Sequence, residues 1–138
     1  LPYEEAKDLI LCAKREKVAT IFLAAPTSTR KRIKDIVKNS TGFIYYVSLT
    51  GVTGARRKLP PEVASNVRAI KSMTRKPVAV GFGIFAPAQA RSIARIADGV
   101  IVGSAIVRII SDNQKNNNVL ISKVSNFSKK LAKAIHND

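Results

Sequence analysis

The sequence has one cysteine, one histidine, no tryptophan and only 9 acidic residues among 138. A single cysteine excludes an internal disulfide framework, and Cys12, which lies within an apolar helical pattern, is expected to be a buried structural thiol. The one histidine, His136, stands beside the C-terminus, so no group of residues has the spacing of a zinc site. The longest apolar runs are far shorter than the ~20 residues that cross a bilayer, and no leader-like segment opens the chain. We therefore expect a soluble, metal-free protein of the cytoplasm or the plastid stroma.

Positive charge is in excess, because 24 lysines and arginines give a formal net charge of +15. The basic residues are spread over four expected helices: Lys14, Arg15 and Lys17; Arg30, Lys31, Arg32, Lys34 and Lys38; Arg68, Lys71, Arg75 and Lys76; and Lys123, Lys129, Lys130 and Lys133. This spread is typical of solvated outer faces, and the aromatic pattern of RNA-binding strands is absent. We expect no specific nucleic acid as a partner and no membrane, although weak, salt-sensitive binding to polyanions follows from charge alone.

Hydrophobic periodicity and turn residues predict alternating helices and strands in a single domain over residues 1–138. Helices are expected at about residues 1–17, from a hydroxyl cap after Pro26 to 39, at 60–73, 87–97, 104–111 and 119–135. Strands are expected at residues 20–25 and 43–48, after Pro77, and after the Asp98-Gly99 pair. Four strands with five or six helices indicate an α/β fold of about four βα units.

Two glycine turns close the last two expected strands, in residues 78–83 (VAVGFG) and 100–105 (VIVGSA). Both runs are rich in β-branched residues, which predicts strands of a parallel sheet that are buried on both faces. Glycine lets the backbone approach a ligand, and N–H groups at the start of the next helix favour an anion. Adjacent turns of this kind predict a phosphate cup, which the last two βα loops of a (β/α)8 barrel often form.

Length limits how much of such a barrel the chain supplies. A complete barrel needs about 250 residues, and this chain has 138. The first expected element is a helix, whereas each barrel helix follows its own strand. We therefore expect the C-terminal half of a (β/α)8 barrel that lacks its N-terminal half.

Four motifs resemble the tryptophan synthase alpha subunit: residues 25–29 (APTST), 42–56 (GFIYYVSLTGVTGAR), 80–84 (VGFGI) and 99–107 (GVIVGSAIV). They stand in that family's order and spacing, and the resemblance covers the whole chain as the C-terminal half of the subunit. It implies a carbon–carbon lyase that cleaves indole-3-glycerol phosphate to indole and glyceraldehyde 3-phosphate. The implied partner in an α2β2 complex is a beta subunit, which holds pyridoxal phosphate, so no cofactor is expected in this chain.

The resemblance also implies roles for individual residues. The substrate phosphate would be bound by Gly54, Gly83, Gly103 and Ser104. The indole pocket would include Leu23, Tyr45, Phe82 and Ile101. The segment 49–59 resembles a mobile loop that closes over substrate, in which Thr53 would orient a catalytic carboxylate. Core packing and an ordinary exposed loop are the alternative interpretations of the last two groups.

The chemistry itself is not found in this chain. General acid and base groups are needed at the C-terminal ends of the strands, and none of the nine acids is expected there: Glu4, Glu5, Asp8, Glu16, Asp35, Glu62, Asp98, Asp112 and Asp138. In the family both catalytic carboxylates belong to the half that precedes residue 1. We therefore expect no catalytic residue here and no activity of the chain alone.

A smaller departure from the family lies at Phe85 and Ala88, where a capping hydroxyl and a glutamate are common. The loss of a helix cap typically costs ~1 kcal/mol, so we expect a weaker start to the helix that follows Phe85.

Two other functions remain open from the sequence: half of another phosphate-binding biosynthetic barrel, and a basic nucleic-acid-binding remnant of an enzyme. The 49–56 segment (LTGVTGAR) speaks against the first. An open half-barrel exposes two sheet edges and an apolar inner face with Phe43, Tyr45, Phe82 and Ile101. We therefore expect the chain to pair with an N-terminal half or to self-associate.

Overall fold

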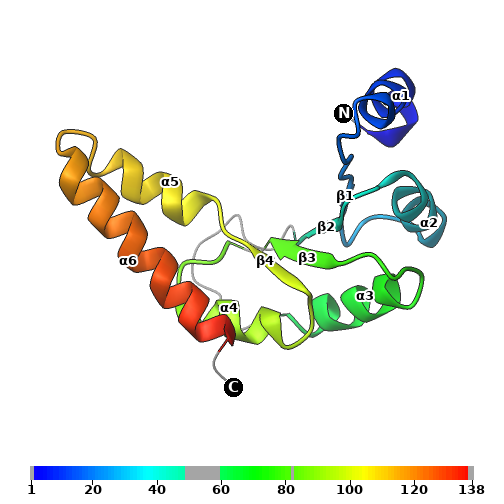
Figure 1. Cartoon of the computed structure of the whole chain (residues 1–138). Helices are drawn as coiled ribbons and strands as arrows, with labels where there is room; N and C mark the ends of the chain where they lie inside the picture. The colour runs from blue at the N-terminus through cyan, green and yellow to red at the C-terminus, as the bar shows by residue number, and fades with distance from the viewer. Residues whose placement is uncertain (1, 49–59, 82, 137–138) are drawn as a thin grey trace.

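The computed structural model describes residues 2–48, 60–81 and 83–136 as an α/β fold (Figure 1). In chain order its elements are the 3-10 helix η1 (Tyr3–Glu5), α1 (Lys7–Arg15), β1 (Leu23–Ala24), α2 (Arg30–Asn39), β2 (Ile44–Val47), α3 (Pro61–Lys71), β3 (Val78–Gly81), α4 (Pro87–Ala94), β4 (Gly99–Ile101), α5 (Ser104–Ser111) and α6 (Asn117–His136). The expected alternation of helices and strands is confirmed.

The four strands form one parallel sheet in the order β1-β2-β3-β4. Each strand therefore pairs with the next strand along the chain, and the order does not reverse within the sheet. A doubly wound sheet reverses its order at a switch point, whereas a (β/α)8 barrel adds its strands consecutively. The observed order matches the barrel type of winding.

The core lies between one face of the sheet and the helices, with α3 and α4 below the sheet in Figure 1. On β2 the side chains alternate, because Ile44 and Tyr46 are fully buried while Tyr45 and Val47 are half-buried. The helix-facing cluster also includes Val78 and Val80 of β3, Val63, Val67 and Ile70 of α3, and Ala90 and Ile93 of α4. Burial thus gives the sheet a covered outer face and an opposite, less covered inner face.

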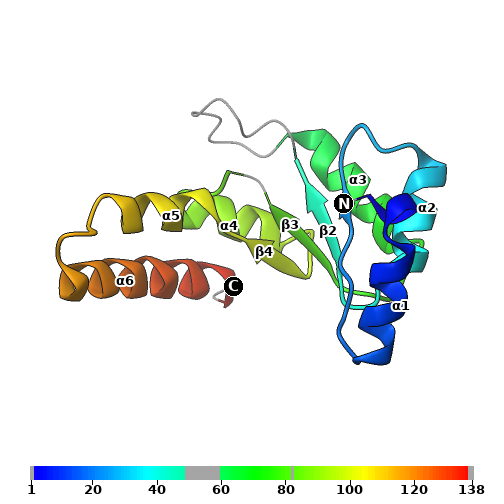
Figure 2. The same cartoon turned by 90° about the horizontal axis from the view of Figure 1, so that it is seen from above.

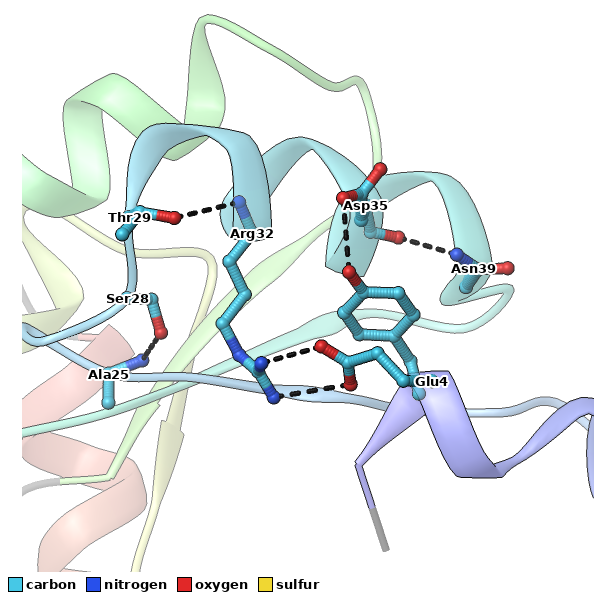
Figure 3. Close-up of polar contacts among 8 residues, drawn as sticks. Glu4, Ala25, Ser28, Thr29, Arg32, Asp35 and Asn39 are labelled. Carbon is cyan, nitrogen blue, oxygen red and sulfur yellow. Dashed lines mark hydrogen bonds and ion pairs between the residues drawn. The ribbon is translucent and has the colours of Figure 1, made fainter.

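Hydroxyl and proline residues mark the starts of α2, α3 and α4. Thr29 caps α2 through its Oγ1, which accepts from the backbone N–H of Arg32 at 3.2 Å (Figure 3). Ser28 instead accepts from the N–H of Ala25 at 3.1 Å and closes the turn after β1. Pro61 and Pro87 occupy the first positions of α3 and α4, where a missing N–H has no consequence.

The expected first helix, residues 1–17, is divided into η1 and α1 at Ala6, which is fully buried. Contacts to α2 hold η1 in place. The Tyr3 hydroxyl donates to Asp35 Oδ2 at 3.0 Å, and the Arg32 guanidinium pairs with Glu4 at 2.6 Å (Figure 3). Tyr3 also meets Phe22 edge to face. Tertiary packing thus overrides continuous helix formation at this point.

The first strand is also shorter than the expected residues 20–25. The Thr20 N–H donates to Thr41 Oγ1 at 2.8 Å, and the Phe22 N–H donates to Ser40 Oγ at 3.2 Å. These backbone groups therefore bond to side chains that precede β2, and regular strand pairing begins only at Leu23.

Two burial predictions are wrong. Cys12 is exposed, because α1 turns it away from the core and α1 has no fully buried residue. The strand β4 is only half-buried, unlike β3, which is buried throughout. Its position at the end of the described sheet leaves one side of β4 without a neighbouring strand.

The basic residues that the structure describes lie mainly on exposed surface, as expected, with two exceptions. Arg32 is half-buried against Tyr3 and Glu4, and Lys76 donates to the carbonyl of Val37 at 2.6 Å. In the part of the chain that the structure describes, no helix is long and apolar enough to cross a membrane.

Candidate functional site

The sheet register brings the two glycine turns to one place. Gly81 of β3 is paired with Ile101 of β4. Gly83 follows the first of these residues by two positions, and Gly103 follows the second by two. Because β3 and β4 are parallel neighbours, both glycines leave the sheet at its C-terminal edge, side by side, and both are exposed. The register therefore places Gly83 and Gly103 at the same edge of the sheet.

The two glycines differ in what their backbone requires. Gly83 has a φ of 30°, in the left-handed range where a side chain is strained. Gly103 has a φ of −115°, and a Cβ built on it would meet no atom within 4 Å. Neither the φ angle nor the packing thus requires glycine at residue 103. The close approach of a ligand would require it, because a Cβ would stand in the way.

The helix α5 begins at Ser104, directly after Gly103, and so points its first N–H groups out of the same edge. The first N–H groups of a helix lack partners within the helix and carry partial positive charge. The Ser104 hydroxyl is exposed and adds a further donor. The first turn of α5 therefore offers backbone and hydroxyl donors at the edge of the sheet where the glycine turns lie.

The start of the neighbouring helix α4 is capped by a side chain from its own first turn. Oε1 of the buried Gln89 accepts from the N–H groups of Phe85 and Ala86, each at 3.0 Å. Gln89 thus supplies the acceptor whose loss was expected to weaken the start of this helix. The sequence alone does not show that the Gln89 amide reaches back to residues 85 and 86.

Three of the four residues expected around an indole ring lie on the inner face of the sheet. Leu23, Tyr45, Ala79 and Gly99 are paired across the four strands in turn, so they lie on the same face. Ile101 is two residues beyond Gly99 on β4 and therefore lies on this face too. Leu23 is 58 % exposed, and Tyr45 and Ile101 are half-buried. The structure therefore brings these apolar side chains to one accessible surface, next to the glycine turns.

The ring of Tyr45 also explains why residue 81 is glycine. A Cβ at Gly81 would lie 2.5 Å from the Tyr45 Oη and 2.6 Å from its ring. Gly81 is paired with Val47, two residues beyond Tyr45, so the ring leans toward the C-terminal edge of the sheet. In the sequence, the glycines that close this strand are explained by the approach of a ligand, because the packing of a ring against a neighbouring strand cannot be seen in one strand.

Part of the expected site lies outside the described residues. This holds for Gly54, Thr53 and the rest of the 49–59 loop, and for Phe82.

Several of the described acids form contacts away from the glycine turns. Glu4 pairs with Arg32, and Glu16 pairs with Arg15. Asp98 accepts from the Val78 N–H at 2.9 Å and from Lys71 Nζ at 2.6 Å, at the N-terminal edge of the sheet. Among residues 2–48, 60–81 and 83–136, no carboxylate lies on a strand or in the turn that directly follows one.

The two contacts of Asp98 perturb its titration. The hydrogen bond from Lys71 and then that from the Val78 backbone lower the pKa of Asp98 below its ordinary value. An ionised carboxylate that ties two strand starts together is suited to structure, not to proton transfer.

The sequence model of the tryptophan synthase alpha chain family matches residues 1–136. Among curated relatives, the tryptophan synthase alpha chain of Geobacter sulfurreducens is 51 % identical over 109 residues, which are 79 % of this chain and 41 % of that protein. The alpha chain of Dehalococcoides mccartyi is 42 % identical over 135 residues, which are 98 % of this chain and 51 % of that protein.

Solved structures agree with this. A chain from the tryptophan synthase α2β2 complex of Pyrococcus furiosus superposes with a TM-score of 0.84 at 37 % identity, covering 96 % of this chain and 52 % of that one. Tryptophan synthase of Mycobacterium tuberculosis, in an open form, gives a TM-score of 0.82 at 30 % identity, covering 98 % and 47 %. The chain spans about half the length of the relatives that it matches.

Proposed function

The chain belongs to the tryptophan synthase alpha chain family, and on this basis we propose that it serves the cleavage of indole-3-glycerol phosphate to indole and glyceraldehyde 3-phosphate. Its part in this carbon–carbon lyase reaction is binding: it supplies the phosphate site and part of the indole pocket. The single observation that carries the proposal is the pairing of Gly81 with Ile101, because it sets two glycine turns and one helix start at the same edge.

The phosphate is bound by backbone and hydroxyl donors. Gly103 lets the phosphate approach without a Cβ, and the Ser104 N–H and hydroxyl donate to its oxygens at the positive end of α5. Gly83 supports the neighbouring turn through its positive φ. Gly54, from the loop 49–59, completes this set.

The indole ring lies against Leu23, Tyr45, Phe82 and Ile101. Three of these have accessible side chains on the inner face, and burial of apolar surface of this kind stabilises an aromatic ligand by roughly 25 cal/mol per Å². Residues 1–138 act as one domain, four βα units of a (β/α)8 barrel whose other half covers the inner face.

The other half also brings the catalytic acid and base, because the strand ends described here carry no carboxylate. The loop 49–59 closes over substrate, and Thr53 orients one of the catalytic carboxylates. A beta subunit with pyridoxal phosphate consumes the indole, and this chain itself uses no cofactor.

The proposal is tested by measuring the binding of glycerol phosphate by calorimetry, with the parent chain and with Gly103→Val. We expect the substitution to weaken binding by at least about tenfold, because an isopropyl group enters the cup and blocks its donors. The control is Ala69→Val, which turns an exposed methyl group of α3 into the same isopropyl group.

Net charge is the same in all three proteins, so general attraction of anions to a +15 chain cancels from the comparison. Equal affinities in the chain and in Gly103→Val would reject the phosphate site.

A further inference from the structure

Two helices begin at the edge of the sheet where the glycine turns lie. The helix α4 follows β3 and begins at Pro87, and α5 follows β4 and begins at Ser104. In both views β4, α4 and α5 lie on the side of the molecule away from α1 (Figures 1 and 2). The residue before each helix, Ala86 or Gly103, has no side-chain acceptor, so the first N–H groups of either helix could attract an anion. The proposed phosphate site uses only the start of α5.

The two helices differ at their third residue. In α4 this residue is Gln89, which is only 8 % exposed. Its Oε1 accepts from the N–H groups of Phe85 and Ala86, each at 3.0 Å. In α5 the third residue is Ile106, whose side chain has no polar atom. Gln89 therefore satisfies two N–H groups at the start of α4, whereas Ile106 cannot do this at the start of α5.

Gln89 also fixes the path of the turn that follows Gly83. Gly83 has a φ of 30°, and the next residue, Ile84, is packed into the core at 2 % exposure. Core packing thus holds Ile84, and the two hydrogen bonds to Gln89 hold Phe85 and Ala86. The segment between the glycine turn and α4 is therefore fixed along its whole length before any ligand binds.

We propose that Gln89 is a positioning residue, which directs the substrate phosphate to the start of α5 by keeping the N–H groups at the start of α4 bonded to itself. The inference rests on the phosphate site given under Proposed function. An anion at the start of α4 would have to displace the Gln89 amide and leave a buried polar group unpaired. At α5 the side chains of Gly103 and Ile106 offer no competing acceptor. The phosphate therefore lies where Ser104 adds its hydroxyl.

Loss of the Gln89 acceptor would have two effects on the phosphate site. The N–H groups of Phe85 and Ala86 would become available to an anion, and the turn after Gly83 would lose two hydrogen bonds that hold it. A site that must be ordered on binding has a lower affinity than a pre-formed site. The suitable substitution is Gln89→Met, because methionine keeps an unbranched side chain and its sulfur is only a weak acceptor.

Two-dimensional NMR spectra of the backbone amides, recorded while glycerol phosphate is added, test the proposal residue by residue. In the parent chain the signals of Gly103 and Ser104 are expected to shift and those of Phe85 and Ala86 to stay in place. In Gln89→Met the signals of Phe85 and Ala86 are expected to shift as well, and the affinity to fall about fivefold. Gln89→Glu keeps an acceptor at the same place, so the signals of Phe85 and Ala86 should again stay.

A control variant separates positioning of the phosphate from a general loss of stability. Asn66 of α3 donates to the Oη of the buried Tyr46 at 2.9 Å, on the covered face of the sheet. Asn66→Leu therefore removes a hydrogen bond of the core without touching the start of α4 or α5. Both Asn66→Leu and Gln89→Met are expected to lower the midpoint of urea unfolding. Only Gln89→Met is expected to change the affinity and the response of the Phe85 and Ala86 signals.

Signals of Phe85 and Ala86 that shift in the parent chain, or that fail to shift in Gln89→Met, would overturn the proposal. Failure of the phosphate site itself gives a different result. If the signals of Gly103 and Ser104 do not respond in the parent chain, the site is rejected, and this role of Gln89 with it. If they respond equally in the parent chain and in Gln89→Met, with the same affinity, only the role of Gln89 is rejected.

Discussion

Replacing Gly103 by alanine shows whether this glycine is needed for ligand binding or for the backbone conformation of the turn. The φ of −115° at this residue is in the range that alanine adopts, and the new Cβ would meet no atom within 4 Å. The free energy of unfolding should therefore change by no more than about 0.5 kcal/mol, or rise slightly, since alanine has less conformational freedom in the unfolded chain. Affinity for glycerol phosphate should fall about tenfold, equal to roughly 1.4 kcal/mol.

Gly83→Ala is the matched comparison. Its φ of 30° forces a Cβ into a strained conformation, at a cost of roughly 1–2 kcal/mol in the free energy of unfolding. Urea unfolding measures stability and calorimetry measures binding, on both variants. Gly103→Ala is expected to bind more weakly without loss of stability, and Gly83→Ala is expected to lose stability. A Gly103→Ala protein that is destabilised by more than about 1 kcal/mol, or that binds phosphate normally, would refute this expectation.

Three further substitutions test other parts of the structure. Gly81→Ala should destabilise the chain by roughly 1–3 kcal/mol, because its Cβ overlaps Tyr45, and Tyr45→Ala should relieve most of that loss in the double variant; a purely additive double variant would speak against the ring contact. Asp98→Asn should lower the free energy of unfolding by about 1 kcal/mol at neutral pH. The value is small because the side chain is 39 % exposed, so solvent screens its ion pair. Since the folded-state pKa of Asp98 is lowered, the difference from the parent should persist above the ordinary carboxyl pKa and vanish as pH falls through the folded value; a pH-independent difference in urea unfolding would contradict this. Cys12 should react with a maleimide in the native protein, as mass spectrometry would show, and protection until unfolding would contradict its exposure.

The sequence was sufficient to predict the order of elements and the winding of the fold. The bounds of α5 agree with the expectation, which rested on Gly103 before the helix and the polar segment after it, since most residues of Ser104–Ser111 are weak helix formers. Strand β3 is buried as its unbroken apolar run indicates. These features depend on local spacing, which one sequence contains in full.

Features that depend on tertiary contacts could not be predicted from local patterns. The exposure of Cys12 reflects which face of α1 meets the core, and η1 is held by Asp35 and Arg32, some thirty residues along the chain. The reason for Gly81 lies on the neighbouring strand, in Tyr45. In the site, the glycine turns were predictable as motifs, but their alignment required the pairing of β3 with β4.

Indole release from indole-3-glycerol phosphate shows whether the chain contributes binding residues and another polypeptide the catalytic acid and base. The chain is assayed alone, and again with a polypeptide that matches the remaining part of the Geobacter alpha chain. No release above background is expected from the chain alone, and measurable release is expected from the mixture, reduced when Gly103→Val replaces the parent chain. Turnover by the chain alone would contradict this expectation, as would a mixture that forms a stable complex and releases no indole.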